Sequence, residues 1–159
     1  MVKALFINGS PRKNGNTAQL LKRAMDGARE AGAEVELVNL YDRNLNYKGC
    51  MSCFACKVKG GKKGVCSATI YTMNCPNEEV YRQMNYPILM DTSAKQLAVF
   101  GPTEILCSYD TYQFSNYDRY DAATFSEAHK AEVRETQFPI DLEKAYELGK
   151  RLVKKCTEV

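Results

Sequence analysis

The strongest constraint on the fold of this chain is its opening, where an apolar run, a polar loop and an amphipathic segment follow one another. Residues 2–7 are almost entirely apolar and lead into Asn-Gly, which predicts a strand buried on both faces. We expect Asn16 or Thr17 to cap a helix next, because apolar residues then recur on one face. Gly32 is typical of a helix end. Residues 34–40 predict a second strand, so the opening forms a βαβ unit with a right-handed crossover.

The rest of the chain continues to alternate strands with helices. The predicted elements, in chain order, are a strand at 68–73, a helix at about 78–99, a strand at 103–107, and helices near 124–136 and 141–155. Pro87 should bend the first of these helices, because it removes a backbone donor. The tyrosine-rich stretch 109–120 is expected to be an ordered loop. This order predicts an α/β fold, a doubly wound parallel sheet truncated to about four strands, in a single domain over 1–159.

The composition argues against several classes of function. The 159 residues carry 22 Lys and Arg against 19 Asp and Glu, a net charge of +3, without the basic stripe typical of nucleic-acid binding. No apolar run approaches the roughly 18 residues that a membrane span needs, and no signal-peptide pattern precedes the first strand. We therefore expect a cytoplasmic protein. Its seven cysteines should stay reduced there and act as metal ligands, redox groups or buried packing.

The loop after the first predicted strand has the features of an anion site. A helix that begins at the carboxyl end of a parallel strand offers unpaired amides and the positive end of its dipole. The loop adds hydroxyl, amide and guanidinium donors, namely Ser10, Arg12, Asn14, Asn16 and Thr17. It is neither a G-x-G-x-x-G dinucleotide loop nor a Walker A loop. We predict a phosphate-bearing ligand here; the alternative is a well-capped turn that binds nothing.

A second group of candidate residues lies in a Cys-rich loop at about 48–67. Four cysteines follow the pattern C-x2-C-x2-C-x9-C: Cys50, Cys53, Cys56 and Cys66. Thiolates two residues apart can converge on one metal centre, and three in series with a fourth nearby suit a 4Fe-4S cluster. A structural zinc site and free or redox-active thiols remain alternatives. The other three cysteines are expected to be small buried apolar residues: Cys75, Cys107 and Cys156.

Residues 3–17, which read KALFINGSPRKNGNT, resemble the opening of the flavodoxin-like NADPH-dependent FMN reductases, especially the iron-sulfur flavoproteins among them. The resemblance is specific over residues 2–66 and weaker from Ala68 onward. It implies a flavodoxin-like sheet, FMN as the cofactor, and phosphate contacts from Ser10, Arg12, Asn16 and Thr17. The Cys-rich loop is similar to the cluster motif of the iron-sulfur flavoproteins, in which the gap before the last cysteine is shorter.

The function implied by this resemblance is that of an FMN-binding oxidoreductase. Such a protein passes electrons from NAD(P)H to a small acceptor, here with an iron-sulfur cluster as a further carrier. The flavin does the redox chemistry, so we assign no catalytic residue, and the single histidine, His129, is expected on a surface helix. The alternative is a degenerate flavodoxin-like binding or assembly protein without turnover, or one with a structural metal at the Cys-rich loop.

Compared with the family that it resembles, the sequence lacks one strand and the loop that follows it. FMN lies at the switch point between the first and third strands of a 2-1-3-4-5 sheet, but here the Cys-rich loop leads directly into the equivalent of the fourth strand. The chain is then a deletion variant, has its sheet completed by another subunit, or folds without flavin. We expect contacts to the flavin ring from Thr72, Met73 and Asn74, from the tyrosine loop, or from a partner chain.

The missing strand also predicts a homo-oligomer. Its loss should leave apolar surface without an intramolecular cover, and such patches usually mark association surfaces. Residues 109–125 offer several tyrosines together with Arg119, which are residue types favoured at interfaces. The alternative is that these tyrosines pack over their own helix ends.

Overall fold

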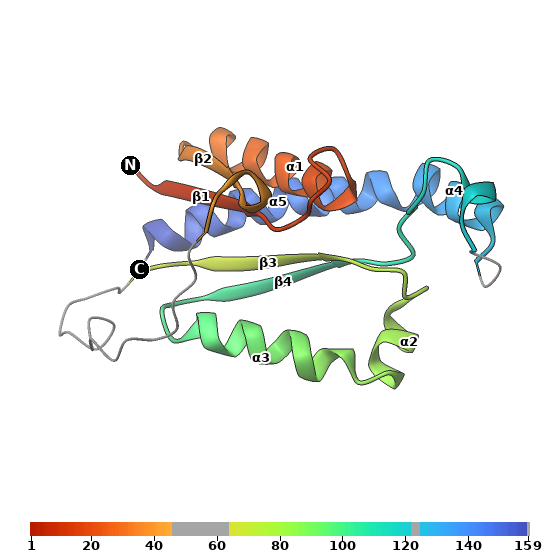
Figure 1. The fold of residues 1–159 in the computed structure, drawn as a ribbon. Helices are drawn as coiled ribbons and strands as arrows, with labels where there is room; N and C mark the ends of the chain where they lie inside the picture. The colour runs from red at the N-terminus through yellow and green to blue at the C-terminus, as the bar shows by residue number, and fades with distance from the viewer. Residues whose placement is uncertain (46–63, 122–124, 159) are drawn as a thin grey trace.

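The computed structural model describes residues 1–45, 64–121 and 125–158 (Figure 1). Its elements are β1 (Lys3–Asn8), α1 (Asn16–Glu30), β2 (Glu34–Asn39), the 3-10 turn η1 (Leu40–Asp42), β3 (Ser67–Thr72), α2 (Glu78–Gln83), α3 (Tyr86–Ala98), β4 (Thr103–Ser108), the 3-10 turn η3 (Tyr117–Arg119), α4 (Glu127–Thr136) and α5 (Phe138–Thr157). The predicted order of strands and helices is confirmed. None of these helices is both long and apolar enough to pass through a membrane.

All four described strands are parallel, but they form two pairs instead of one continuous sheet. β1 pairs with β2 from Lys3 opposite Glu34 to Asn8 opposite Asn39, and β3 pairs with β4 in the same manner. No hydrogen bonds join β1 to β3 in the described part of the chain. Helices α1 and α5 lie on one side of both pairs, and α3 lies on the other side of β3 and β4 (Figure 1). The architecture is the predicted doubly wound α/β fold with a break in its sheet.

The face of β1 that points away from α1 and α5 carries apolar side chains in contact with solvent. Alternate residues of a strand point to opposite faces, and Phe6 and Asn8 face the helices, where Asn8 is buried. Leu5 and Ile7 point the other way and are 58% and 51% exposed. This face of β1 is therefore uncovered, as expected if the helices that would pack there are missing.

The core joins the two strand pairs through the helix layer. Leu20 and Ala24 of α1 pack against Phe138 and Ala145 of α5, and all four side chains are almost fully buried. Side chains from both strand pairs and from α5 complete the cluster: Phe6, Ile70, Leu106 and Leu142. Burial of such side chains contributes about 1.5–3 kcal/mol each. The two pairs are thus held together mainly from one side.

The helices α1 and α5 approach so closely that only glycine fits at two points of contact. A Cβ atom on Gly149 would lie 1.9 Å from the carbonyl oxygen of Ala24, and one on Gly27 would lie 2.0 Å from that of Tyr146. Real side chains never come so near to backbone atoms. The two glycines therefore allow the helix backbones to touch, which brings the rest of both helices into contact.

Two local predictions are wrong in detail, and the structure shows why. The predicted helix 78–99 is two helices, because Asn85 takes a left-handed conformation with φ 58° between them and Pro87 then opens α3. The residue that precedes α1 is Gly15, in place of Asn16 or Thr17, and it makes no side-chain cap. The helix end was predicted correctly, since Gly32 follows α1 with φ 85°.

We predict that Gly149→Ala destabilises the fold by about 2–3 kcal/mol, because overpacking of this size forces backbone shifts. Urea unfolding followed by circular dichroism measures the change. Gly9→Ala is the matched control: a Cβ atom there meets nothing within 4 Å, so its stability should stay within about 0.5 kcal/mol of the parent. An unchanged midpoint for Gly149→Ala would contradict the close helix contact.

Candidate functional site

The loop between β1 and α1 is shaped by its own polar side chains. The Asn8 Oδ1 atom accepts a hydrogen bond from the Ser10 amide at 3.0 Å, and the Ser10 hydroxyl oxygen accepts one from the Arg12 amide at 3.2 Å. The Gly15 amide then donates to the Arg12 carbonyl at 3.1 Å. Because α1 has no side-chain cap, its first amides keep their capacity to donate to a ligand.

The carboxyl ends of β3 and β4 meet this loop from the other strand pair. The hydroxyls of Thr17 and Thr72 lie 2.7 Å apart and hydrogen-bond across the break in the sheet. The Thr111 amide, just after β4, donates to the Met73 carbonyl at 3.0 Å. The loops that follow three parallel strands therefore form one continuous edge, which is where ligands bind in open α/β sheets.

A hollow of about 200 Å³ lies at this edge, between the start of α1, the loop after β4 and helix α4. Its lining residues are Arg12, Gly15, Asn16, Tyr112, Gln113, Phe114, Ser115 and Arg134. Arg12 donates to the Gln113 carbonyl at 2.7 Å, and the Asn16 side-chain amide donates to the Tyr112 carbonyl at 2.7 Å. These two bonds hold the loop after β4 against the loop after β1 and so form the walls of the hollow.

Arg134 of α4 gives the hollow a second guanidinium. It donates to the side-chain oxygens of Asn16 at 3.0 Å and Gln19 at 2.8 Å, and it lies 4.1 Å from the centre of the Phe138 ring. Burial lowers the pKa of Arg134 from its ordinary value. All these partners are uncharged, and no carboxylate is among the described residues that line the hollow. Two arginines, a helix start and no acidic residue make an environment suited to an anion.

The structure brings some of the predicted ligand residues to the hollow and assigns others elsewhere. Arg12 and Asn16 line it, and Ser10, Thr17 and Thr72 support the loop beside it. The Asn14 side chain is different, because it is exposed and accepts a hydrogen bond from Lys22 on the outside of α1. Met73 and Asn74 take part in contacts within the protein, Met73 through its carbonyl to Thr111 and Asn74 through its side-chain oxygen to Lys130.

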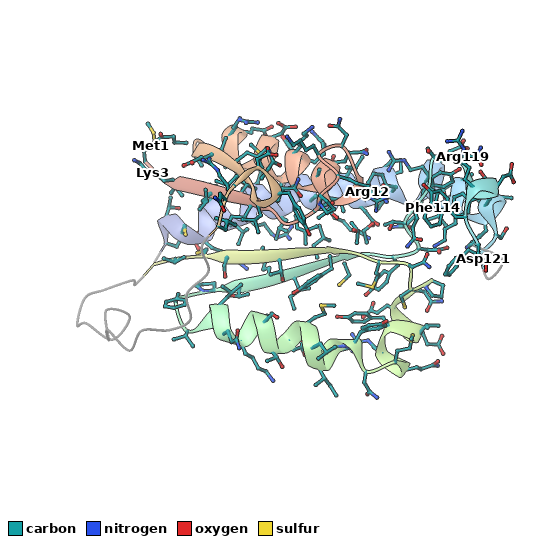
Figure 2. All side chains as sticks on the ribbon, viewed as in Figure 1. Met1, Lys3, Arg12, Phe114, Arg119 and Asp121 are labelled. Atoms are coloured by element: carbon teal, nitrogen blue, oxygen red, sulfur yellow. The ribbon has the colours of Figure 1, made fainter. Side chains whose placement is uncertain are left out.

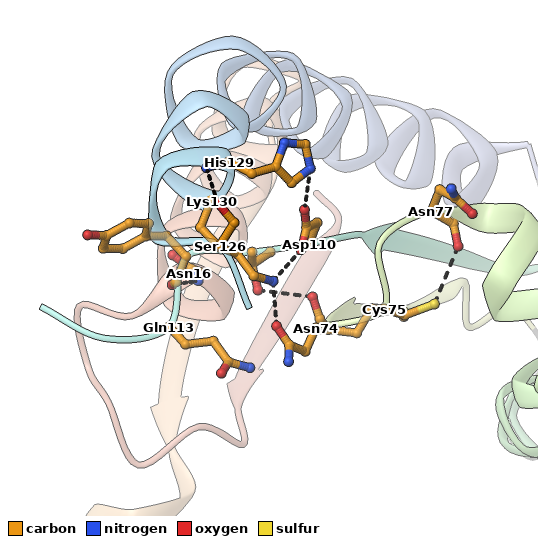
Figure 3. Close-up of polar contacts among 12 residues, drawn as sticks. Asn16, Asn74, Cys75, Asn77, Asp110, Gln113, Ser126, His129 and Lys130 are labelled. Atoms are coloured by element: carbon orange, nitrogen blue, oxygen red, sulfur yellow. Dashed lines mark hydrogen bonds and ion pairs between the residues drawn. The ribbon is translucent and has the colours of Figure 1, made fainter. Parts of the chain in front are cut away.

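A buried ion pair fixes the loops beside the hollow (Figure 3). Lys130 of α4 is 2% exposed and contacts both the Asp110 carboxylate and the Asn74 side chain. The other Asp110 oxygen lies 3.0 Å from Nε2 of His129, and the Asp110 amide donates to the Cys75 carbonyl at 2.8 Å. A buried charge pair is costly to break, so these contacts hold α4 and the two strand loops in one arrangement.

Aromatic side chains continue outward from the hollow along the loop after β4. The rings of Phe114 and Tyr120 stack at 4.3 Å, and Tyr117 meets both Tyr112 and Phe114 edge to face. Figure 2 places Phe114 and Arg119 at the same end of the molecule as Arg12, opposite Met1 and Lys3. These rings therefore pack against one another within the loop.

The predicted cysteine ligands lie largely outside the described residues. The structure does not describe Cys50, Cys53 and Cys56. Among the residues that it does describe, no group of three potential metal ligands occurs. Cys66 is described and directly precedes the amino end of β3. Its amide donates to the Cys156 sulfur at 3.1 Å. Burial, with a hydrogen bond to the Cys156 thiol, raises the pKa of Cys66 to about 11.

Sequence reasoning missed the residues that α4 and the loop after β4 bring to the edge. Arg134 and Lys130 sit in a short helix whose sequence shows no motif, and the Gln113 contribution is a backbone carbonyl. The one signal was the four-residue spacing of Lys130 and Arg134, which puts both side chains on the same face of α4. It is a weak signal, because lysines are usually solvated.

The comparisons with known proteins give sequence matches to one family and to two curated relatives. Residues 2–74 match the sequence profile of the NADPH-dependent FMN reductase family. An iron-sulfur flavoprotein of Methanocaldococcus jannaschii and one of Archaeoglobus fulgidus are each 41% identical over 59 residues, or 37% of this chain. The match spans 30% and 26% of the length of these relatives.

A solved structure shows a similar fold over nearly the whole chain. The azoreductase from Bacillus anthracis superposes with a TM-score of 0.53 at 11% sequence identity, covering 95% of this chain and 100% of that one. At such low identity the likeness concerns the fold alone. It agrees with the flavodoxin-like fold that the sequence predicts.

Proposed function

We propose that this chain, whose residues 2–74 match the sequence profile of the NADPH-dependent FMN reductase family, is an oxidoreductase that holds FMN by its phosphate in the hollow at the start of α1. The observation that carries the proposal is the pair Arg12 and Arg134, which line the hollow without a carboxylate beside them. A phosphate would accept from both guanidiniums and from the first amides of α1. The two iron-sulfur flavoproteins share 41% identity with this chain over 59 residues.

The residues present fit the phosphate end of the cofactor. The hollow of about 200 Å³ is smaller than the ~300–1,000 Å³ of pockets that enclose a whole cofactor or drug-sized ligand. It therefore suits a phosphate and the start of the ribityl chain, while the ring would lie outside. The side chains at its mouth that can flank a ring are Tyr112 and Phe114, and Thr72 lies at the adjoining strand end.

In this proposal the flavin supplies the electron transfer and the protein binds and orients it. NAD(P)H is the proposed electron donor, and a small molecule is the proposed acceptor. The chain's own contribution is positional: Arg12 and Asn16 anchor the loop after β4, and the Lys130–Asp110 pair keeps that loop from moving. No acid or base is needed for this role.

The alternative is a flavodoxin-like binding or assembly protein that does not turn over. It is favoured by the break between β1 and β3, because a flavin ring normally lies at this point of the sheet. An absorption spectrum of the purified protein separates the two functions. Bound flavin gives bands near about 375 and 450 nm, which come from the cofactor itself, and their absence after incubation with FMN would favour the alternative.

We further propose an iron-sulfur cluster at the Cys-rich loop, with Cys50, Cys53, Cys56 and Cys66 as the ligands. Support comes from their spacing and from the names of the two relatives, each called an iron-sulfur flavoprotein. Of the four, the structure describes Cys66 alone. Zinc and free thiols remain the competing interpretations of this loop.

We also propose that the chain works as a homo-oligomer. In the described part of the chain, one edge of β1 and one edge of β3 have no paired strand at the break in the sheet, and backbone groups at such edges readily pair with another strand. The uncovered face of β1 with Leu5 and Ile7 adds apolar surface next to the break. A second copy of the chain can cover both features at once.

We predict that Arg134→Met weakens FMN binding about ten- to a hundredfold, because a hydrogen bond to a charged group contributes about 1.5–3 kcal/mol. Replacing Ser10 and Asn16 together by Ala should cost about 2–4 kcal/mol, since neighbouring effects rarely add fully. Isothermal titration with FMN measures both. Arg82→Met is the matched control, because Arg82 pairs with Glu78 on an exposed helix. Equal FMN affinity for Arg134→Met and the control would contradict binding of the phosphate in this hollow.

We predict that iron bound by protein purified without air is lost when any one of Cys50, Cys53 and Cys56 is changed to Ser. Their two-residue spacing places the thiolates around a single centre. Metal analysis of the three variants decides the matter, with Cys75→Ser as the control. Stoichiometric zinc in the parent would support a structural metal, and full iron retention in all three variants would exclude the cluster.

We predict that the protein elutes as a dimer or larger at micromolar concentration. Light scattering coupled to size exclusion measures the mass directly. Leu5→Lys combined with Ile7→Lys should shift the mass toward 17.9 kDa, because it places charge on the uncovered strand face. A parent that is already a monomer and binds FMN would refute both the oligomer and the need for a partner strand.

A further inference from the structure

Two cysteines that lie 90 positions apart in the sequence meet where β3 begins and α5 ends. The Cys66 amide donates to the Cys156 sulfur at 3.1 Å, and the Cys156 thiol donates to the Gly64 carbonyl at 3.3 Å. Both residues are partly exposed, so a small reagent can reach them.

The backbone around Cys66 is held in place independently of the thiols. A Cβ atom on Gly101, where φ is 152°, would lie 2.3 Å from the Val65 carbonyl oxygen, so the chain packs tightly against that glycine. The Ser67 amide donates to the Pro102 carbonyl at 2.9 Å. On the other side, Lys155 next to Cys156 pairs with Glu104 of β4 at 2.7 Å. Both partners are therefore fixed to the same strand pair, which keeps the sulfurs together.

We propose that Cys66 and Cys156 form a reversible intramolecular disulfide when the protein meets a small-molecule disulfide such as oxidised glutathione. One cysteine thiolate attacks the small disulfide, forms a mixed disulfide and releases one small thiol. The second cysteine thiolate then attacks the protein sulfur of the mixed disulfide, forms the Cys66–Cys156 bond and releases the second small thiol. Two protein thiols are oxidised, and the small disulfide is reduced to two thiols.

The consequence of this bond is a choice between two states of Cys66. In the disulfide its sulfur is tied to α5, and it is no longer a thiolate that could ligate a metal. In the thiol state it is free to do so. For the proposed cluster, on which this consequence rests, the pair would make the fourth cysteine ligand available only in the reduced protein. Formation of the bond itself does not depend on flavin or metal.

Peptide mapping after oxidation tests the proposal on the unmodified full chain. The protein is treated with oxidised glutathione, its remaining thiols are alkylated under denaturing conditions, and it is cut with trypsin without reduction. Trypsin cuts after Lys63, Arg82 and Lys155, so the expected product joins peptide 64–82 to peptide 156–159. A reducing agent should release both, and a non-reducing gel should show the band at the monomer position.

Peptide 64–82 also contains Cys75, which makes Cys75→Ser the matched control. The crosslink should persist in Cys75→Ser and vanish in Cys66→Ser and in Cys156→Ser. In the parent, oxidation should raise the midpoint of thermal unfolding by about 5–10 °C, since the bond closes a long loop. Linkage of Cys156 to Cys75, linkage of Cys66 to a cysteine of the Cys-rich loop, or alkylation of both thiols after oxidation would each overturn the proposal.

Discussion

The contact between α1 and α5 holds the molecule together, because the sheet does not. A continuous sheet would link all strands by backbone hydrogen bonds, but here β1 and β3 share none in the described residues. The two strand pairs are united by the helix layer, in which Leu20 and Ala24 contact Phe138 and Ala145. The short distance between the two helix backbones depends on Gly27 and Gly149, because a side chain at either position would push the helices apart. A change at either glycine should therefore loosen the relation between the strand pairs as well as between the helices.

The candidate site depends on the same arrangement. The loop after β1 belongs to the first strand pair, while the loop after β4 and the helix α4 belong to the second half of the chain. Arg12 and Asn16 reach across to backbone carbonyls of the loop after β4, and Arg134 returns to Asn16 from α4. The hollow therefore exists only while both halves keep their positions. The buried Lys130–Asp110 pair contributes to this by joining α4 to the end of β4.

Much of the fold could be predicted from local patterns, whereas most of the site could not. Apolar runs and turn residues place each strand within a residue or two, and Gly32 marks the end of α1. The break between β1 and β3 has no local signal, because strand pairing depends on the distant segments available. Arg134 and the Cys66–Cys156 contact are long-range as well, joining residues about 90 to 120 positions apart. The loop donors were predictable because they follow one another in the sequence, although Asn14 faces Lys22 instead.

Cys66 and the hollow lie at opposite ends of β3, and this separation bears on how electrons could move. Cys66 precedes the amino end of β3, and Thr72 ends that strand and contacts Thr17 at the start of α1. Six residues of strand span about 20 Å, so Cys66 and the loop that carries Arg12 are separated by roughly that length within one copy. The proposed oligomer bears on this separation, because a second copy that brings its β3 start to the first copy's hollow would shorten it.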